Sequence, residues 1–146
     1  MIQQDKYTLI FFYGLFMDES VLTEKGIQPA SSAIGYVDGY ALHIGERATL
    51  VREEGGRTYG IMMAIDEKEA QALYADESVA DYRRESVVVH LNKGVQRDAF
   101  CYNLPYDQFA GTNTEYATAL FMLATKLCLP ENYLSQIKKF IFERQG

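Results

Sequence analysis

The sequence predicts an α+β fold, because strand-like and helix-like patterns occupy different parts of the chain. Strand-like segments fill the first two-thirds, whereas the last third carries apolar residues at helical spacing. Repeated βα units would interleave the two patterns, so this segregation argues against a doubly wound sheet. At 146 residues the chain can form a sizeable core, and we expect a single domain over residues 1–146.

Three segments predict the first part of the sheet. Residues 7–13 form a continuous apolar run, which suits a central strand covered on both faces. Residues 36–44 alternate between large apolar side chains and small or polar ones, as in a half-buried strand. Residues 48–65 predict a hairpin whose turn is at residues 53–56, where two glutamates precede two glycines.

Two aspartates mark the expected starts of short helices. Asp18 can cap a helix that runs through Lys25. Asp66 precedes an expected helix over residues 67–74, with Glu69 at the position that completes a capping box. The second of these helices therefore ends just before an acid-rich segment.

The rest of the chain predicts one more hairpin and two C-terminal helices. Residues 86–91 are strand-like, and residues 97–102 follow after the Asn92-Lys93-Gly94 turn. From Thr114 onward apolar residues recur every three or four positions, and Pro130 suits the first turn of the last helix.

Composition and charge exclude several classes of protein. The apolar fraction of 48% and the charged fraction of 23% are ordinary for a globular protein. No apolar run approaches the ~18 residues of a membrane span, and the start of the chain lacks the layout of a signal peptide. We therefore expect a cytoplasmic protein without a membrane partner. A net charge of −6 without a Lys/Arg cluster argues against nucleic-acid binding. The sequence does not indicate an oligomeric state.

The two cysteines do not form a metal-binding motif. Cys101 and Cys128 are far apart, have apolar neighbours and lack both CxxC spacing and a nearby histidine. We expect both to be buried, reduced thiols, and we expect no metal and no cofactor.

Two segments could form one reactive site. The loop Tyr13-Gly14-Leu15-Phe16 ends an apolar strand, and free backbone N–H groups in such a loop suit an anion. Residues 73–84 are acid-rich and lead into a buried strand, where a half-desolvated carboxylate can act as a proton acceptor. Spacing alone does not choose among the four acids in and next to this segment, which are Asp76, Glu77, Asp81 and Glu85.

These two segments, in this order, resemble the gamma-glutamylcyclotransferase-like family, of the avirulence-induced-gene-like or gamma-glutamylamine cyclotransferase type. Members open with a strand and a Tyr-Gly-Ser or Tyr-Gly-Thr loop. Later they carry Leu-Asp-x-x-Glu-Gly, followed by a Tyr and often an Arg. Residues 13–16 match the loop, and Leu73 to Tyr82 match the acidic stretch. The chain departs from the pattern at three positions, which are Leu15, Tyr74 and Ser78.

The resemblance implies a fold and a set of site residues. It implies a small, mixed, partly closed β-barrel with packed helices, which the sequence pattern alone would not predict. It assigns Glu77 as the catalytic acid/base. Tyr13, Gly14, Leu15, Phe16 and Tyr82 would bind the substrate.

The implied activity is cofactor-free and acts on a small γ-glutamyl amine, amino acid or peptide. The α-amine of the donor would attack its own side-chain amide and release 5-oxoproline, with Glu77 accepting the amine's proton. No Ser or Cys nucleophile is needed, in agreement with the absence of a GxSxG motif. The three departures support an alternative, a non-catalytic small-molecule-binding domain with the same fold and pocket. A plain interaction domain with an acidic surface is a third interpretation.

Overall fold

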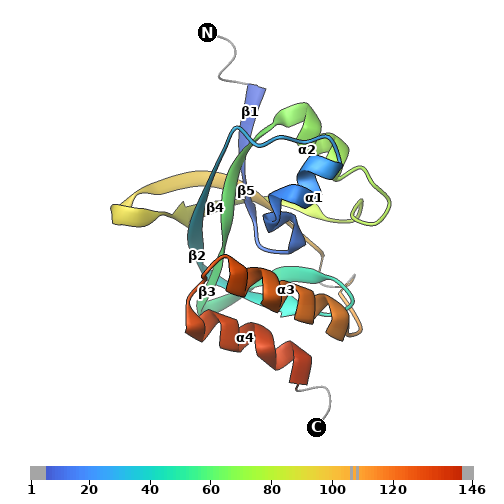
Figure 1. Ribbon diagram of the computed structural model, residues 1–146, viewed down its shortest axis with the longest axis vertical. Helices are drawn as coiled ribbons and strands as arrows, with labels where there is room; N and C mark the ends of the chain where they lie inside the picture. The colour runs from blue at the N-terminus through green and yellow to red at the C-terminus, as the bar shows by residue number, and fades with distance from the viewer. Residues whose placement is uncertain (1–5, 106, 108, 143–146) are drawn as a thin grey trace.

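The computed structural model describes residues 6–105, 107 and 109–142. Figure 1 shows how the elements are arranged. The strands are β1 (Tyr7–Phe12), β2 (Ser31–Ile44), β3 (Ala48–Asp66), β4 (Arg83–His90) and β5 (Gln96–Asn103). The helices are α1 (Glu19–Glu24), α2 (Glu67–Leu73), α3 (Thr114–Lys126) and α4 (Glu131–Phe142), with short 3-10 turns η2 (Leu15–Met17) and η3 (Asn92–Gly94).

The strands close into a small barrel in the order β1-β3-β2-β4-β5, with β5 returning to β1. Closure depends on two narrow seams. A single parallel residue pair, Ile10 with Phe100, joins β1 to β5, and a single pair, Tyr36 with His90, joins β2 to β4. The β2–β4 pair is antiparallel, as are the longer pairings of β1 with β3, β2 with β3 and β4 with β5. The predicted α+β class and the mixed, partly closed barrel are therefore confirmed.

The long β2–β3 hairpin differs from the predicted arrangement. The chain reverses at residues 45–47, where the Gly45 N–H donates to the Arg47 carbonyl, and not at residues 53–56. Gly55 lies inside β3 with a φ of 82°. The register between β3 and β2 shifts at this point, between Asp38 and Tyr40 of β2. The prediction of a turn at residues 53–56 is wrong because a glycine with positive φ suits a β-bulge as well as a turn.

Both predicted helix caps are confirmed. The Asp18 carboxylate accepts a hydrogen bond of 3.0 Å from the Ser20 N–H and begins α1. The Asp66 carboxylate accepts from the N–H groups of Lys68 and Glu69, at 2.8 and 3.3 Å, and begins α2. These bonds satisfy N–H groups that have no partner inside the helix.

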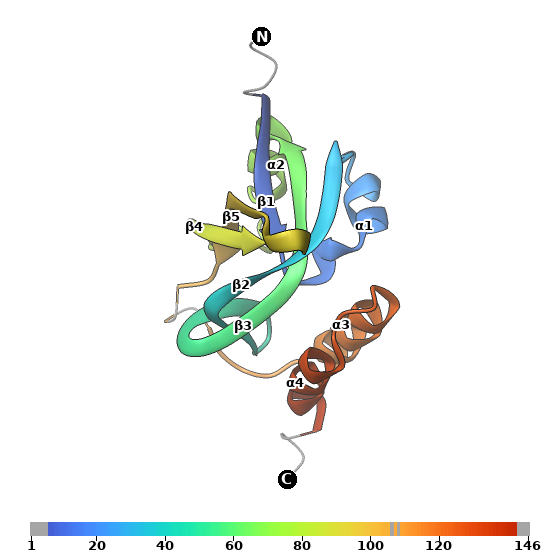
Figure 2. The ribbon, with the colours of Figure 1, turned by 90° about the vertical axis from the view of Figure 1, so that its left-hand side faces the viewer.

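The C-terminal helices share the core of the barrel. In Figures 1 and 2, α3 and α4 lie together at one end of the molecule, opposite the start of β1. Leu120 of α3 and Ile137 of α4 are fully buried, and the ring of Tyr133 contacts that of Tyr59 in β3. Within the described part of the chain, no helix is both long and apolar enough to cross a membrane.

The two cysteines have different environments. Cys101 lies in β5 and is fully buried, as predicted, whereas Cys128 is exposed. The prediction for Cys128 is wrong because this residue lies just beyond α3, with a φ of 62°. Helical periodicity assigns a face to residues inside the helix, and it no longer applies after the backbone turns away.

Candidate functional site

A cavity of about 370 Å³ lies where β1 ends, between the loop that follows β1, the segment from α2 to β4, and α3. This volume is in the range of small-molecule sites, roughly 300–1,000 Å³. The residues that line it are Phe11, Phe12, Tyr13, Gly14, Leu15, Phe16, Val21, Arg47, Ala48, Tyr74, Ser78, Val79, Tyr82, Tyr102 and Tyr116. Most of the wall is therefore aromatic.

A second, larger groove of about 640 Å³ lies between β1, β2, β4 and β5. It is lined partly by Asp38, His90 and Asp98. None of the predicted site residues borders it, so the smaller cavity is the candidate site.

The Tyr13–Phe16 loop lies at the cavity, beyond the sheet pairing. β1 stops at Phe12, and Gly14 is extended with φ and ψ of −111° and −151° before the 3-10 turn η2. The Leu15 N–H donates to the Tyr116 hydroxyl at 3.3 Å. Within the described residues, the N–H groups of Gly14 and Phe16 have no bonded acceptor. The loop thus retains two backbone donors that a ligand anion can use.

Five of the lining residues are tyrosines, and they make much of the cavity wall neutral and hydrogen-bonding. The Tyr13 hydroxyl donates to the Tyr102 carbonyl at 2.6 Å, and the Tyr82 hydroxyl donates to the Ala48 carbonyl at 2.5 Å. Burial raises the pKa of Tyr82 above its ordinary value, raises that of Tyr13 well above it, and raises that of Tyr116 to about 12. Removal from water penalises the phenolate, so these rings stay neutral at physiological pH.

Tyr74 replaces the aspartate of the family pattern and forms part of the same wall. Its ring stacks on that of Tyr102, with centroids 3.7 Å apart and planes at 10°. The ring of Phe16 meets Tyr74 edge-on at 6.0 Å. An aromatic side chain thus fills space at this position, where the family pattern has an acid.

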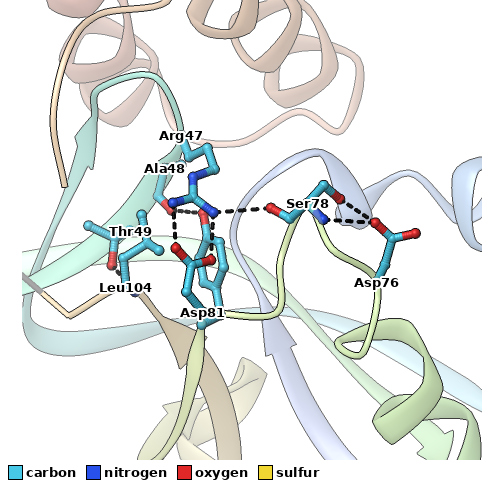
Figure 3. Close-up of polar contacts among 8 residues, drawn as sticks. Arg47, Ala48, Thr49, Asp76, Ser78, Asp81 and Leu104 are labelled. Carbon is cyan, nitrogen blue, oxygen red and sulfur yellow. Dashed lines mark hydrogen bonds and ion pairs between the residues drawn. The ribbon is translucent and has the colours of Figure 1, made fainter. Parts of the chain in front are cut away.

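Arg47 is the one charged side chain among the described residues that line the cavity. It comes from the turn between β2 and β3, and Figure 3 shows it next to Asp81 and Ser78. Its Nη1 and Nη2 donate to the two carboxylate oxygens of Asp81, each at 2.7 Å, and Nη1 also donates to the Ser78 carbonyl at 3.1 Å. This hydrogen bonding lowers the pKa of Asp81 from its ordinary value. Sequence reasoning missed Arg47, because nothing in the local pattern distinguishes it from a solvated arginine.

Glu77 lies outside the cavity lining. It is exposed in the turn between α2 and β4, where its neighbours Ser78 and Val79 face the cavity. The turn is held by Asp76, whose carboxylate accepts from the N–H and the hydroxyl of Ser78 at 2.9 and 2.7 Å (Figure 3). Among the described lining residues there is no Asp or Glu.

The structure thus brings the predicted loop, residues 13–16, together with Tyr82 but not with Glu77. The catalytic role of Glu77 stays a prediction. The described residues contain no cluster of three or more His, Cys, Asp or Glu that could hold a metal ion.

A family model described as gamma-glutamyl cyclotransferase, AIG2-like, matches residues 10–119 of the 146. The chain belongs to this family. The matched range includes each residue that lines the cavity. A comparison with curated proteins finds no match.

Solved structures share the fold at low sequence identity. A structure titled gamma-glutamyl cyclotransferase is 17% identical, with a TM-score of 0.73 over 90% of this chain and 86% of its own. An uncharacterized protein from Homo sapiens is 18% identical, with a TM-score of 0.73 over 91% and 87%. YkqA from Bacillus subtilis is 22% identical, with a TM-score of 0.74 over 97% of this chain but 56% of its own.

Proposed function

We propose that this protein binds a small γ-glutamyl compound in the tyrosine-lined cavity and that its reaction is cyclisation of that compound. The observation that carries the proposal is the overlap between the family match and the cavity, because the matched residues 10–119 contain the whole lining. The N–H groups of Gly14 and Phe16 would hold the donor's α-carboxylate, since backbone donors in a turn suit an anion.

The proposed reaction needs no nucleophile from the protein. The α-amine nitrogen of the donor attacks the γ-carbonyl carbon and closes a five-membered ring. The bond from that carbon to the leaving nitrogen then breaks, which gives 5-oxoproline and a free amine. The α-ammonium loses two protons before its nitrogen becomes the ring N–H, and the leaving nitrogen takes up both and departs as an ammonium. The cavity contributes mainly by holding the donor folded and by directing the Tyr116 hydroxyl, whose proton is free, toward the developing oxyanion.

The reaction does need a proton acceptor, and Glu77 is the proposed one. Its carboxylate is exposed, so it would have to turn toward the side on which Ser78 and Val79 face the cavity. Ser78 is held by hydrogen bonds from Arg47 and to Asp76, so this movement requires rearrangement of the turn.

A second candidate function is binding without turnover. The absence of Asp and Glu from the described lining favours it, as does the aromatic ring of Tyr74 at a position where the family has an acid. Without a carboxylate at the cavity, the α-ammonium would keep its proton and the bound donor would remain uncyclised.

Calorimetry and 5-oxoproline release, measured on the same panel of γ-glutamyl compounds, test both candidates. We expect binding and turnover in the wild-type protein. In Glu77→Gln we expect unchanged binding and a roughly 10²–10⁴-fold slower rate, because the amide cannot accept the ammonium proton. Asp76→Asn is the neighbouring control and should leave the rate nearly unchanged. Binding with no turnover would establish the second candidate, and no binding would overturn both.

A further inference from the structure

We infer that Arg47 binds the carboxylate of the group that is attached to the γ-glutamyl moiety. The ligands are then γ-glutamyl amino acids or peptides with a free C-terminal carboxylate, and not γ-glutamyl amines. This inference rests on the proposed function, since it assumes a γ-glutamyl compound in the tyrosine-lined cavity.

The guanidinium of Arg47 has one edge in use and one edge free. It carries five N–H donors, and the described contacts use three of them. Two donate to Asp81 and one to Ser78, all through the Nη atoms. The Nε–H and the second Nη2–H have no bonded acceptor among the described residues. These two donors form the side-on edge, which matches the two oxygens of a carboxylate.

The internal pair with Asp81 leaves Arg47 available for a ligand. Both side chains are 34% exposed, so water screens their attraction and a second carboxylate can share the cation. The guanidinium stays protonated, since hydrogen bonding to Asp81 raises the pKa of Arg47 further above its ordinary value. It also lies 5.6 Å from the ring centroid of Tyr82, which keeps it against the cavity wall.

The composition of the cavity lining explains why Arg47 alone would distinguish γ-glutamyl amino acids from γ-glutamyl amines. The other lining residues are aromatic, aliphatic or neutral polar, so no second basic side chain competes for an anion in the described lining. The α-carboxylate of the donor has its own place at the backbone of residues 14–16. The carboxylate of the attached amino acid therefore has Arg47 as its partner. A γ-glutamyl amine has no such carboxylate, so the free edge of Arg47 would stay unpaired.

A matched pair of ligands tests the inference. γ-Glutamyl-alanine and γ-glutamyl-ethylamine differ by one carboxylate, and calorimetry gives the dissociation constant of each. We expect the wild-type protein to bind γ-glutamyl-alanine at least about tenfold more tightly, as for other charge-assisted hydrogen bonds. The preference should shrink as salt is raised, because both charges are partly exposed.

Three variants separate ligand recognition from a structural role of Arg47. Arg47→Gln should remove the preference and weaken mainly γ-glutamyl-alanine. Asp81→Asn should keep or increase the preference, because the guanidinium loses its internal partner. Arg57→Gln is the matched control: it breaks another Arg–Asp pair, with Asp38 at 2.7 Å, away from the cavity, and should keep the wild-type preference.

Each contrary result has a distinct meaning. Equal affinity of the wild-type protein for the two ligands would overturn the inference while leaving the proposed function intact. Equal weakening of both ligands by Arg47→Gln would also overturn it, because Arg47 would then only hold the turn around Ser78. No binding of either ligand would overturn the proposed function and this inference together.

Discussion

Buried tyrosine hydroxyls give the cavity its hydrogen-bonding capacity. Tyr116 shows how this works, because its oxygen accepts from the Leu15 N–H while its own proton is free to point into the cavity. The same contact fixes the loop against α3. A hydroxyl so placed supports the shape of the loop and has a proton that it could donate to the proposed ligand.

Replacing Tyr116 by Phe should therefore weaken two properties at once. The Leu15 N–H loses its acceptor, so the free energy of unfolding should fall by about 1 kcal/mol, and ligand affinity should fall several-fold. Chemical denaturation and calorimetry with γ-glutamyl-alanine measure the two effects. Tyr7→Phe alters an exposed tyrosine and should change neither. Unchanged affinity in Tyr116→Phe would mean that the hydroxyl does not reach the ligand.

The two cysteines should differ sharply in reactivity. Burial raises the pKa of the Cys101 thiol to about 12, and the thiolate is the reactive form. Cys128 is exposed. A thiol reagent at neutral pH should therefore label Cys128 in the native protein and label Cys101 only after denaturation. Mass spectrometry of the native sample would contradict the buried position if it found label on Cys101.

Within the sheet, close contact between β1 and β3 sets the position of the loop at the cavity. A Cβ atom at Gly60 of β3 would collide with the backbone carbonyl of Phe12, the last residue of β1, and with the ring of Phe11. Because the obstacle is backbone, it cannot move aside by changing a rotamer. The glycine therefore lets β1 approach closely and end where the loop begins.

The substitution Gly60→Ala tests this close approach. We expect the unfolding free energy to fall by about 3 kcal/mol, which is near the upper end of the usual cost of an overpacked core. We also expect weaker ligand binding. Gly26→Ala is the matched control, since no atom of the described residues lies within 4 Å of its Cβ position. Its φ of 85° should cost about 1 kcal/mol, and ligand affinity should stay unchanged. Equal effects of the two variants would contradict a steric role for Gly60.

Taken together, the barrel and the last two helices bury one continuous set of apolar side chains. Tyr133 of α4 packs on Tyr59 of β3, and Tyr116 of α3 packs on the loop after β1. Tyr116 of α3 closes the cavity on one side, and α4 packs against α3, so the candidate site depends on both helices. Such shared burial predicts that helices and barrel unfold together.

Unfolding followed by two probes tests that cooperativity and the prediction of a single domain. The chain has eleven tyrosines and no tryptophan, so tyrosine fluorescence reports the packing around those rings, whereas far-UV circular dichroism reports the secondary structure. We expect coincident transitions. We expect Ile137→Ala, at a fully buried position of α4, to lower the unfolding free energy by about 2–5 kcal/mol with either probe. Ile34→Ala, at a 45% exposed position, should change stability by less than about 0.5 kcal/mol. Two separate transitions would contradict the single domain.

Features that depend on near neighbours in the chain can be predicted from the amino-acid sequence alone. The apolar run of β1, the Asp18 and Asp66 caps and the spacing in α3 and α4 each involve residues within a few positions, so local chemistry specifies them. The barrel followed from the family resemblance, since closure joins strands that are distant in the chain. The hairpin turn was misplaced because Gly55 meets the demands of a bulge and a turn equally well.

Which residues line the cavity depends on contacts between distant parts of the chain. Arg47 meets Asp81 across 34 positions of sequence, and Leu15 meets Tyr116 across 101. Such contacts depend on strand register and on how the barrel closes, which no local pattern encodes. The same reason separates Glu77 from Ser78, because only the folded structure shows that Ser78 lines the cavity and that Glu77 does not. Hydrogen bonds from Arg47 and to Asp76 hold Ser78 in place.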